Sequence, residues 1–332
     1  MNATPRRGPD RQRPTMVDVA RHAGVSLKTV SRVVNNAPHV QQRLVEKVLA
    51  AVEELGFQRN QLASALRSGQ QTATIGLLIE EIANPFYATI AQVTAEVAAA
   101  FDSLLITASS EEDPVREERL LRDLCSRRVD GLLVVPAGYD HSFLKPEVER
   151  GIPVVFLDRP GGGIEADTVL LDNRGGAETA MKQLVAQGHR RVAVLLDSTE
   201  VFTMRERLSG ALAAFPTSVV REHVHDPATA ADATADLLDA PDPPTAFFGL
   251  NNRITVGIVQ ELCRRGSRAA VMGFDDFELS HLMPIPLTVI AYDTRELART
   301  AAELLFARIA RETFRPRTVI LSTTLIQRGL AA

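Results

Sequence analysis

The stretch from Thr15 to Asn36 most constrains how this chain folds, because two short helical patterns meet there at a glycine. Gly24 lies between the patterns, where the backbone must enter the left-handed region. Ser26 follows it as an N-cap for the second helix. Apolar residues at helical spacing predict one buried face on this small unit: Val17, Val19, Ala20, Ala23 and Val25.

The second predicted helix buries Val30 and Val33 and leaves a polar face. Its exposed positions are Leu27, Lys28, Thr29, Ser31, Arg32 and Asn35. Guanidinium, ammonium, hydroxyl and amide groups are those that reach base edges and phosphate oxygens in a DNA major groove. The pattern therefore indicates a helix-turn-helix that reads DNA. A capped surface helix in an ordinary helical domain is the alternative.

The charge distribution points the same way. Residues 1–71 contain 11 Lys and Arg against 5 Asp and Glu, a balance of +6, and the rest of the chain carries −10, which gives the formal net charge of −4. A basic N-terminal unit on an acidic body indicates that only the first part meets a polyanion.

Composition limits the remaining classes of protein. A chain of 332 residues that is 45% hydrophobic can form two or three domains with a large core. No apolar run reaches the roughly 18 residues of a membrane helix, and the Arg-bearing N-terminus lacks the apolar segment of a secretory signal. Cys125 and Cys263 are far apart, so reduced thiols are expected. We expect a cytoplasmic protein that does not enter a membrane.

The local patterns divide the chain into four parts. Residues 1–14 are rich in Pro and Arg and are predicted to be a disordered basic arm. Residues 15–59 form the helix-turn-helix headpiece, with three helices. Residues 60–71 form a short hinge helix and a linker. Residues 72–332 form a two-lobed body that binds an effector and dimerises.

The body alternates strand-sized apolar runs with helical patterns, which predicts parallel sheets wrapped by helices. A second series of such units begins near Thr168 with the strand TVLLD. The predicted fold is therefore an all-α headpiece followed by an α/β body of two doubly wound lobes. PGGG at 160–163 lacks the spacing of a dinucleotide loop and is predicted to be a flexible connection.

Characteristic segments recur in order through nearly the whole chain after residue 14. They include DVARHAGVSLKTVSRVVNN (18–36), NPFY (84–87), IPVVFLDR (152–159), DNRGGAETA (172–180), RERLSG (205–210) and GFDD (273–276). In these segments the chain resembles the LacI/GalR family of bacterial transcription regulators. The resemblance implies a body like a periplasmic sugar-binding protein. It also implies a homodimer, or a tetramer, that binds a pseudo-palindromic operator in double-stranded DNA, most often as a repressor, and that responds to a small-molecule effector between the lobes.

The resemblance assigns roles on the second helix. Leu27, Lys28 and Arg32 stand where family members reach base edges. Arg32 is predicted to read a guanine, whereas Lys28 could contact phosphate alone. Thr29 and Ser31 are more plausible phosphate contacts.

A hinge helix is implied by three further matches, Asn60, Ala63 and Leu66. The residue that matches Leu66 wedges into a central base step from the minor groove in the family. Without the resemblance, Leu66 is an ordinary helix leucine.

The effector pocket is assigned from family positions that hydrogen-bond the ligand, namely Arg205, Asn251 and Asp275. A structural ion pair between the lobes is the alternative. Second-rank pocket candidates are Phe86, Tyr87, Asp158 and Tyr292, of which the first two could equally be core residues. Asp226 and Pro227 fall where family sugar binders often carry an aromatic platform, and the chain has no Trp. A stacked sugar is therefore less expected, and another small polar ligand gains weight.

No catalytic, cofactor or metal site is expected. The chain has no nucleophile elbow or P-loop, and His223 and His225 lack convincing partners for a metal. The sequence predicts a ligand-responsive DNA-binding regulator. The alternatives are a solute-binding protein with the same body and an α/β enzyme with an accessory DNA domain.

Overall fold

The computed structural model describes residues 14–34, 37–57, 72–311 and 315–329. The chain divides into two compact units, residues 1–72 and residues 73–332. The predicted basic arm lies outside the described residues except for Pro14. The predicted hinge, residues 60–71, lies wholly outside them.

The first unit is a cluster of three helices, α1 (Met16–Ala23), α2 (Leu27–Val34) and α3 (Gln42–Leu55). Thr15 begins α1 with a capping box, and Gly24 ends it in the left-handed region at φ 62°. Apolar side chains from all three helices form its core: Val19, Ala20, Val30, Val33, Val48, Ala51 and Phe57. The buried positions predicted on α2 are thus confirmed.

Val17 differs from its predicted place in this core, since it is 51% exposed. Met16, Val19, Ala20 and Ala23 have the i, i+3, i+4, i+7 spacing of one helix face and pack together in this core. Val17 lies one residue, about 100° of helical turn, off that face.

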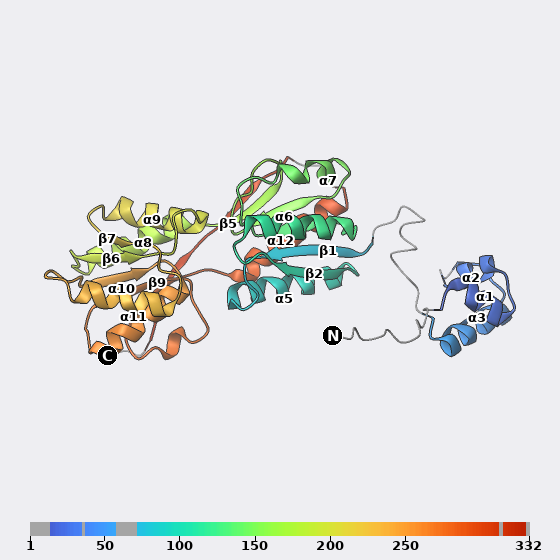
Figure 1. Ribbon diagram of the computed structural model, residues 1–332, viewed down its shortest axis with the longest axis horizontal. Coiled ribbons are helices and arrows are strands. Elements are labelled where there is room, and N and C mark those ends of the chain that lie inside the picture. Colours follow the sequence, from blue (N-terminus) through green and yellow to red (C-terminus); the bar gives the residue numbers. More distant parts are fainter. Residues whose placement is uncertain (1–13, 35–36, 58–71, 312–314, 330–332) are drawn as a thin grey trace, which may run out of the picture. The chain divides into compact units, whose positions relative to one another are not determined.

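The second unit contains two α/β lobes (Figure 1). The first lobe has a parallel sheet in the order β11-β5-β4-β3-β1-β2. Its strands are β1 (Thr74–Ile79), β2 (Leu104–Ser109), β3 (Leu132–Val134), β4 (Val154–Leu157), β5 (Asp167–Leu171) and β11 (Thr318–Leu321). Its α-helices are α5 (Pro85–Ala100), α6 (Pro114–Ser126), α7 (Lys145–Glu149) and α12 (Thr294–Ile309). Helices α5 and α12 pack in one core cluster and α6 in another, so the sheet is covered on both faces.

The second lobe repeats this plan, with the order β12-β10-β9-β8-β6-β7. Its strands are β6 (Val192–Leu195), β7 (Val219–Arg221), β8 (Ala246–Gly249), β9 (Ala270–Phe274), β10 (Leu287–Ala291) and β12 (Thr324–Arg328). Its α-helices are α8 (Asn173–Ala186), α9 (Phe202–Ala214), α10 (Pro227–Leu238) and α11 (Asn252–Arg265). Helices α8 and α9 pack in one core cluster, and α10 and α11 pack in another. Only β12 runs antiparallel to its neighbour among the described strands of this sheet.

The two lobes are not successive pieces of chain. Strand β5, the predicted TVLLD strand of the second series, pairs with β4 and belongs to the first sheet. After β10 the chain returns to the first lobe as α12 and β11, and then crosses again to β12. The prediction that the second series of units begins with the TVLLD strand was wrong, because the local sequence pattern does not show which sheet a strand joins.

The Pro160–Gly163 segment is close packed and not the predicted flexible connection. A Cβ on Gly162 would lie 2.3 Å from the carbonyl oxygen of Tyr139, and one on Gly161 would lie 2.2 Å from the Phe156 ring. The backbone N–H of His141 donates to the carbonyl oxygen of Gly162 at 2.9 Å. Because glycine has no side chain, this segment can pack closely against the loop that carries Tyr139.

Within the described ranges, no helix has both the length and the apolar composition needed to cross a bilayer.

Candidate functional site

A cavity of about 100 Å³ lies between the two lobes, where the carboxyl ends of strands from both sheets meet. Glu80, Glu112 and Asp158 follow strands of the first sheet, whereas Asn251 and Asp275 follow strands of the second. A wider hollow of about 710 Å³ shares five wall residues with it: Glu112, Arg159, Asp197, Val201 and His225. Ligand sites of α/β proteins typically form at such strand ends.

Six of the seven residues predicted for the effector pocket line this cavity: Phe86, Tyr87, Asp158, Asn251, Asp275 and Tyr292. Their contact with an effector stays a prediction. Arg205 does not line it. Its Nη1 lies 3.1 Å from the hydroxyl of Tyr139 and 3.2 Å from the carbonyl oxygen of Thr199, on the exposed side of α9.

Arg207 occupies the place that the sequence prediction gave to Arg205. Its Nη2 lies 3.0 Å from Oδ1 of Asp275, and its Nε donates to Oδ1 of Asn173 at 2.8 Å. Its guanidinium carbon also lies 3.8 Å from the centre of the Phe274 ring. Arg207, Asp275 and Phe274 all belong to the second lobe, so the ion pair lies within one lobe.

The helical phase of α9 explains why Arg207 and not Arg205 faces inward. The buried residues of α9 are Thr203, Met204, Arg207, Gly210 and Ala211. They have the i, i+3, i+4, i+7 spacing of one face, and Arg205 lies about 200° away from Arg207. The sequence contained this signal, although the resemblance alone did not separate the two arginines of RERLSG.

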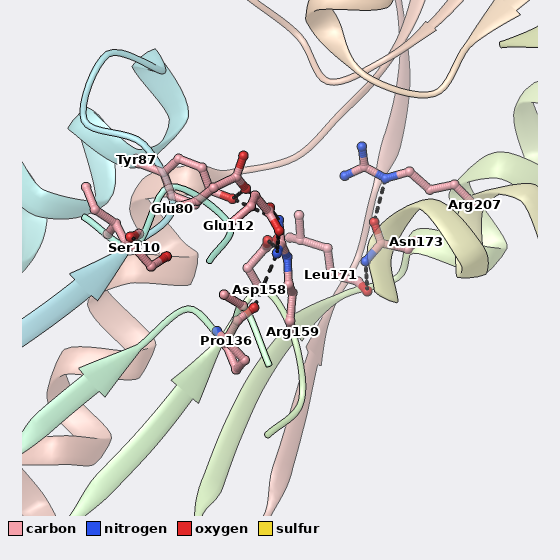
Figure 2. Close-up of polar contacts among 12 residues, drawn as sticks. Glu80, Tyr87, Ser110, Glu112, Pro136, Asp158, Arg159, Leu171, Asn173 and Arg207 are labelled. Atoms are coloured by element: carbon pink, nitrogen blue, oxygen red, sulfur yellow. Dashed lines mark hydrogen bonds and ion pairs between the residues drawn. The ribbon is translucent and has the colours of Figure 1, made fainter. Parts of the chain in front are cut away.

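The first-lobe wall of the cavity centres on Arg159, which the sequence analysis missed. Its Nη2 lies 2.5 Å from Oε2 of Glu80 and 2.6 Å from Oε1 of Glu112, and Tyr87 donates its hydroxyl to Glu80 at 2.6 Å. Figure 2 shows these side chains gathered beside Asp158, with Arg207 bound to Asn173 nearby. Glu80 directly follows β1, and Glu112 comes shortly after β2. Their position after a strand was the signal in the sequence that could have indicated a place in the cavity wall.

Burial governs the ionisation of this wall. It raises the pKa of Glu80 to about 8 against the attraction of Arg159. Burial also opposes the charge of Glu112, but Arg159 leaves the pKa of that carboxyl below its usual value. The pKa of Asp158 is raised to about 6, again chiefly by burial.

Asp158 and Asp275 occupy equivalent places in the two lobes. They follow β4 and β9, which hold the same position in the two strand orders. Both have a positive φ, 66° and 73°, which is uncommon for a residue other than glycine. Asp275 accepts the hydroxyl of Tyr292 at 2.8 Å. Two strained turns thus present carboxylates from opposite lobes to one cavity.

Asn251 has a structural role beside its place in the cavity wall. Its Oδ1 accepts the backbone N–H of Ile254 at 2.8 Å and caps α11. Asn252, the next residue, lines the cavity as well.

Polar contacts of Tyr139 and of Arg253 bridge the two lobes at the rim of the cavity. Tyr139 of the first lobe meets Arg205 and the carbonyl oxygen of Glu200 in the second. On another part of the rim, Nη1 of Arg253 lies 3.1 Å from Oε2 of Glu81. These contacts belong to this arrangement of the lobes and would break if they moved apart.

The candidate DNA-binding face lies on α2. Leu27, Lys28 and Arg32 are exposed, whereas Thr29 and Ser31 are half-buried. Arg32 donates from Nη2 to the carbonyl oxygen of Pro38 at 2.7 Å, so its guanidinium is held by the next loop.

The first turn of α2 is fixed by Ser26, whose Oγ accepts the backbone N–H of Thr29 at 3.1 Å. Four of the predicted DNA contacts lie outside the described residues: Asn35, Asn60, Ala63 and Leu66.

In the ranges that the structure describes, no three or more His, Cys, Asp or Glu side chains are grouped so that they could hold a metal ion.

A helix-turn-helix unit with an exposed polar helix, joined to a two-lobed α/β body with a polar cavity at its strand ends, defines the class of ligand-responsive DNA-binding proteins. Two family models match the chain: "Bacterial regulatory proteins, lacI family" over residues 15–60, and "Periplasmic binding proteins and sugar binding domain of LacI family" over residues 72–329. The chain belongs to the LacI family of bacterial regulatory proteins. The match over 15–60 favours a regulator over a solute-binding protein.

Known relatives are similar over nearly their full length. The ribose operon repressor of Escherichia coli is 32% identical over 330 residues, which cover 96% of this chain and 99% of the relative. The HTH-type transcriptional repressor PurR of Photobacterium profundum is 30% identical over 326 residues, which cover 95% and 97%. Among solved structures, the Lac repressor dimer bound to operator and the anti-inducer ONPF is 25% identical, with 96% and 98% covered and a TM-score of 0.82.

Proposed function

We propose that this protein is a transcriptional repressor that binds a pseudo-palindromic operator as a homodimer. Its operator affinity depends on a small polar effector held in the cavity between the lobes. The observation that carries this proposal is a cavity walled by carboxylates and guanidiniums from two lobes, in a chain that begins with a helix-turn-helix. The names of the ribose operon and PurR relatives support the repressor sense.

DNA recognition is assigned to the headpiece. Leu27, Lys28 and Arg32 reach base edges, with Arg32 as the guanine reader. Thr29, Ser31 and Asn35 support the phosphate contacts. The hinge residues Asn60, Ala63 and Leu66 are assigned to the minor groove, with Leu66 as the wedge.

An exposed apolar sheet edge supports a dimer. Leu104 and Ile106 lie on β2, the edge strand of the first sheet, and Phe101 precedes it. Leu104 is 70% exposed. Edge strands with exposed apolar side chains are normally covered by another chain or element. A dimer would also supply the two headpieces that an inverted repeat requires.

The effector acts by binding two lobe arrangements with different affinity, because only such a difference can shift an equilibrium. The rim contacts of Tyr139 and Arg253 hold one arrangement. In this role the protein acts on chromosomal DNA in the cytoplasm and carries out no catalysis.

The proposal is tested by selecting duplexes from a random pool with the purified protein and measuring affinity at two salt concentrations. We expect an inverted repeat and a steep loss of affinity with salt. Arg32→Ala should cost about 1–3 kcal/mol and relax preference at one position in each half-site. Arg21→Ala, on the exposed side of α1, is the control. Recovery of no preferred sequence would refute the proposed function.

A further inference from the structure

The charged side chains that line the 100 Å³ cavity between the lobes are nearly all paired with oppositely charged groups of the protein. Arg159 pairs with Glu80 and Glu112, and Arg207 pairs with Asp275. The other charged wall residues are also paired: Asp197 with His225 at 2.5 Å, and Arg253 with Glu81 at 3.1 Å.

Asp158 is the most weakly paired of them, since its one ion-pair contact, with Arg159, is long. Its side chain is only 5% exposed, and no hydrogen bond reaches its carboxylate within the described part of the chain. The nearest cationic atom, Nε of Arg159, lies 3.6 Å away and has no hydrogen-bond partner of its own. A buried carboxylate without donors is costly unless a ligand supplies them.

The two buried arginines of the wall, Arg159 and Arg207, have few donors left for an anion, whereas the exposed Arg253 lies at the rim and contacts Glu81. Arg207 uses Nε on Asn173, Nη1 on the carbonyl oxygen of Leu250 and both Nη atoms on Asp275. Arg159 uses Nη1 and Nη2 on Glu112 and Nη2 on Glu80. Recognition of phosphate or carboxylate usually needs an arginine fork that is free to bind both oxygens.

Aromatic rings complete the wall near Asp158. The rings of Phe86 and Tyr87 lie 4.9 Å apart at 70°, and those of Phe86 and Tyr292 lie 5.9 Å apart at 89°. All three residues line the cavity. Aromatic faces beside a carboxylate are a favourable setting for an organic cation, because the ring quadrupole attracts positive charge.

We propose that the effector is a small hydroxyl-bearing organic cation whose protonated amine pairs with Asp158, and not a phosphorylated or carboxylated metabolite. This inference rests on the proposed function, since it names the chemical class of the same effector. Hydroxyls of the ligand would bind Asp275 and Asn251 in the opposite lobe, so the ligand would join the two lobes.

The test uses two probes matched in shape. Tris carries one ammonium and three hydroxymethyl groups on a central carbon, and pentaerythritol replaces the ammonium by a fourth hydroxymethyl group. Inorganic phosphate is the anionic probe. Calorimetric titrations of the full-length protein at pH 7.5, at constant ionic strength in a buffer without primary amines, give the three affinities.

Tris should bind at least about tenfold more tightly than pentaerythritol, and phosphate should not bind in the cavity. Asp158→Asn should remove the preference for Tris, because it keeps the shape but not the charge. Asparagine is also tolerated at positive φ, so this variant should fold. Asp123→Asn, on the exposed face of α6, loses the same charge and should bind Tris as the wild type does.

Equal affinities for Tris and pentaerythritol, tighter binding of phosphate, unchanged Tris binding in Asp158→Asn, or no Tris binding at tens of millimolar would each overturn this inference. Operator affinity is measured on the same preparations. Normal operator binding together with any of these outcomes means that the ligand class is wrong while the proposed DNA-binding function stands.

Discussion

Replacing Arg207 by alanine should destabilise the body far more than replacing Arg205, although only one residue separates them. The Arg207 side chain is 4% exposed and its partner Asp275 is 15% exposed. Its removal leaves Asn173 and the carbonyl oxygen of Leu250 without this donor, and it leaves Asp275 with the Tyr292 hydroxyl but no cation. Breaking a buried ion pair by removing one partner costs about 3–5 kcal/mol. Arg205 is exposed, and its contacts are worth about 0–1 kcal/mol.

Urea unfolding of both variants, followed by circular dichroism, checks this prediction. We expect Arg207→Ala to lower the unfolding midpoint strongly with an unchanged slope, and to lower the melting temperature by about 10 °C. The double variant Arg207→Met with Asp275→Asn should recover part of the loss, because it leaves no buried charge unpaired. Equal losses in Arg207→Ala and Arg205→Ala would refute the assignment of Arg207 as the buried partner.

Three further changes test other parts of the body. Glu80 binds its proton more tightly in the folded protein, because its pKa is raised from 4.5 to about 8, so its contribution to stability falls as the pH rises between these values. Glu80→Gln should therefore reduce the loss of unfolding free energy between pH 5 and pH 8, measured by urea unfolding. The same loss in the variant and the wild type would contradict the burial argument. Gly162→Ala should cost about 1–3 kcal/mol of unfolding free energy, because its Cβ would lie 2.3 Å from the Tyr139 carbonyl oxygen, and a wild-type midpoint would show that the segment yields easily. Tyr139→Ala removes one rim contact, so small-angle scattering without effector should show a larger mean dimension, and an unchanged profile would mean that this contact does not hold the lobes.

The parts of the fold with a strong local pattern were predictable. The 3.6-residue period of α2 placed Val30 and Val33 in the headpiece core, and the alternation of strands and helices indicated the two α/β lobes. The membership of β5 in the first sheet was not predictable, because it depends on pairing with β4.

In the candidate site, too, some residues could be predicted from the sequence and others could not. Asp158 and Asp275, which the family resemblance assigned to the pocket, line the cavity. The choice between Arg205 and Arg207 needed the phase of α9, which the motif alone did not supply. The Arg159 cluster needed the three-dimensional meeting of β1, β2 and β4, whose ends lie far apart in the chain.

The return of the chain to the first lobe also affects how the protein forms during synthesis. Helix α12 supplies Leu297, Ala301 and Leu305 to the first core, and β11 completes the first sheet, yet both lie beyond residue 290. N-terminal domains usually fold while the rest of a chain is still being made. Here the first lobe must wait on the ribosome, with its apolar surface exposed, until most of the second lobe has emerged. A protein lacking α12, β11 and β12 would therefore lose both lobes together, and nascent chains of this length are where we expect chaperones to bind.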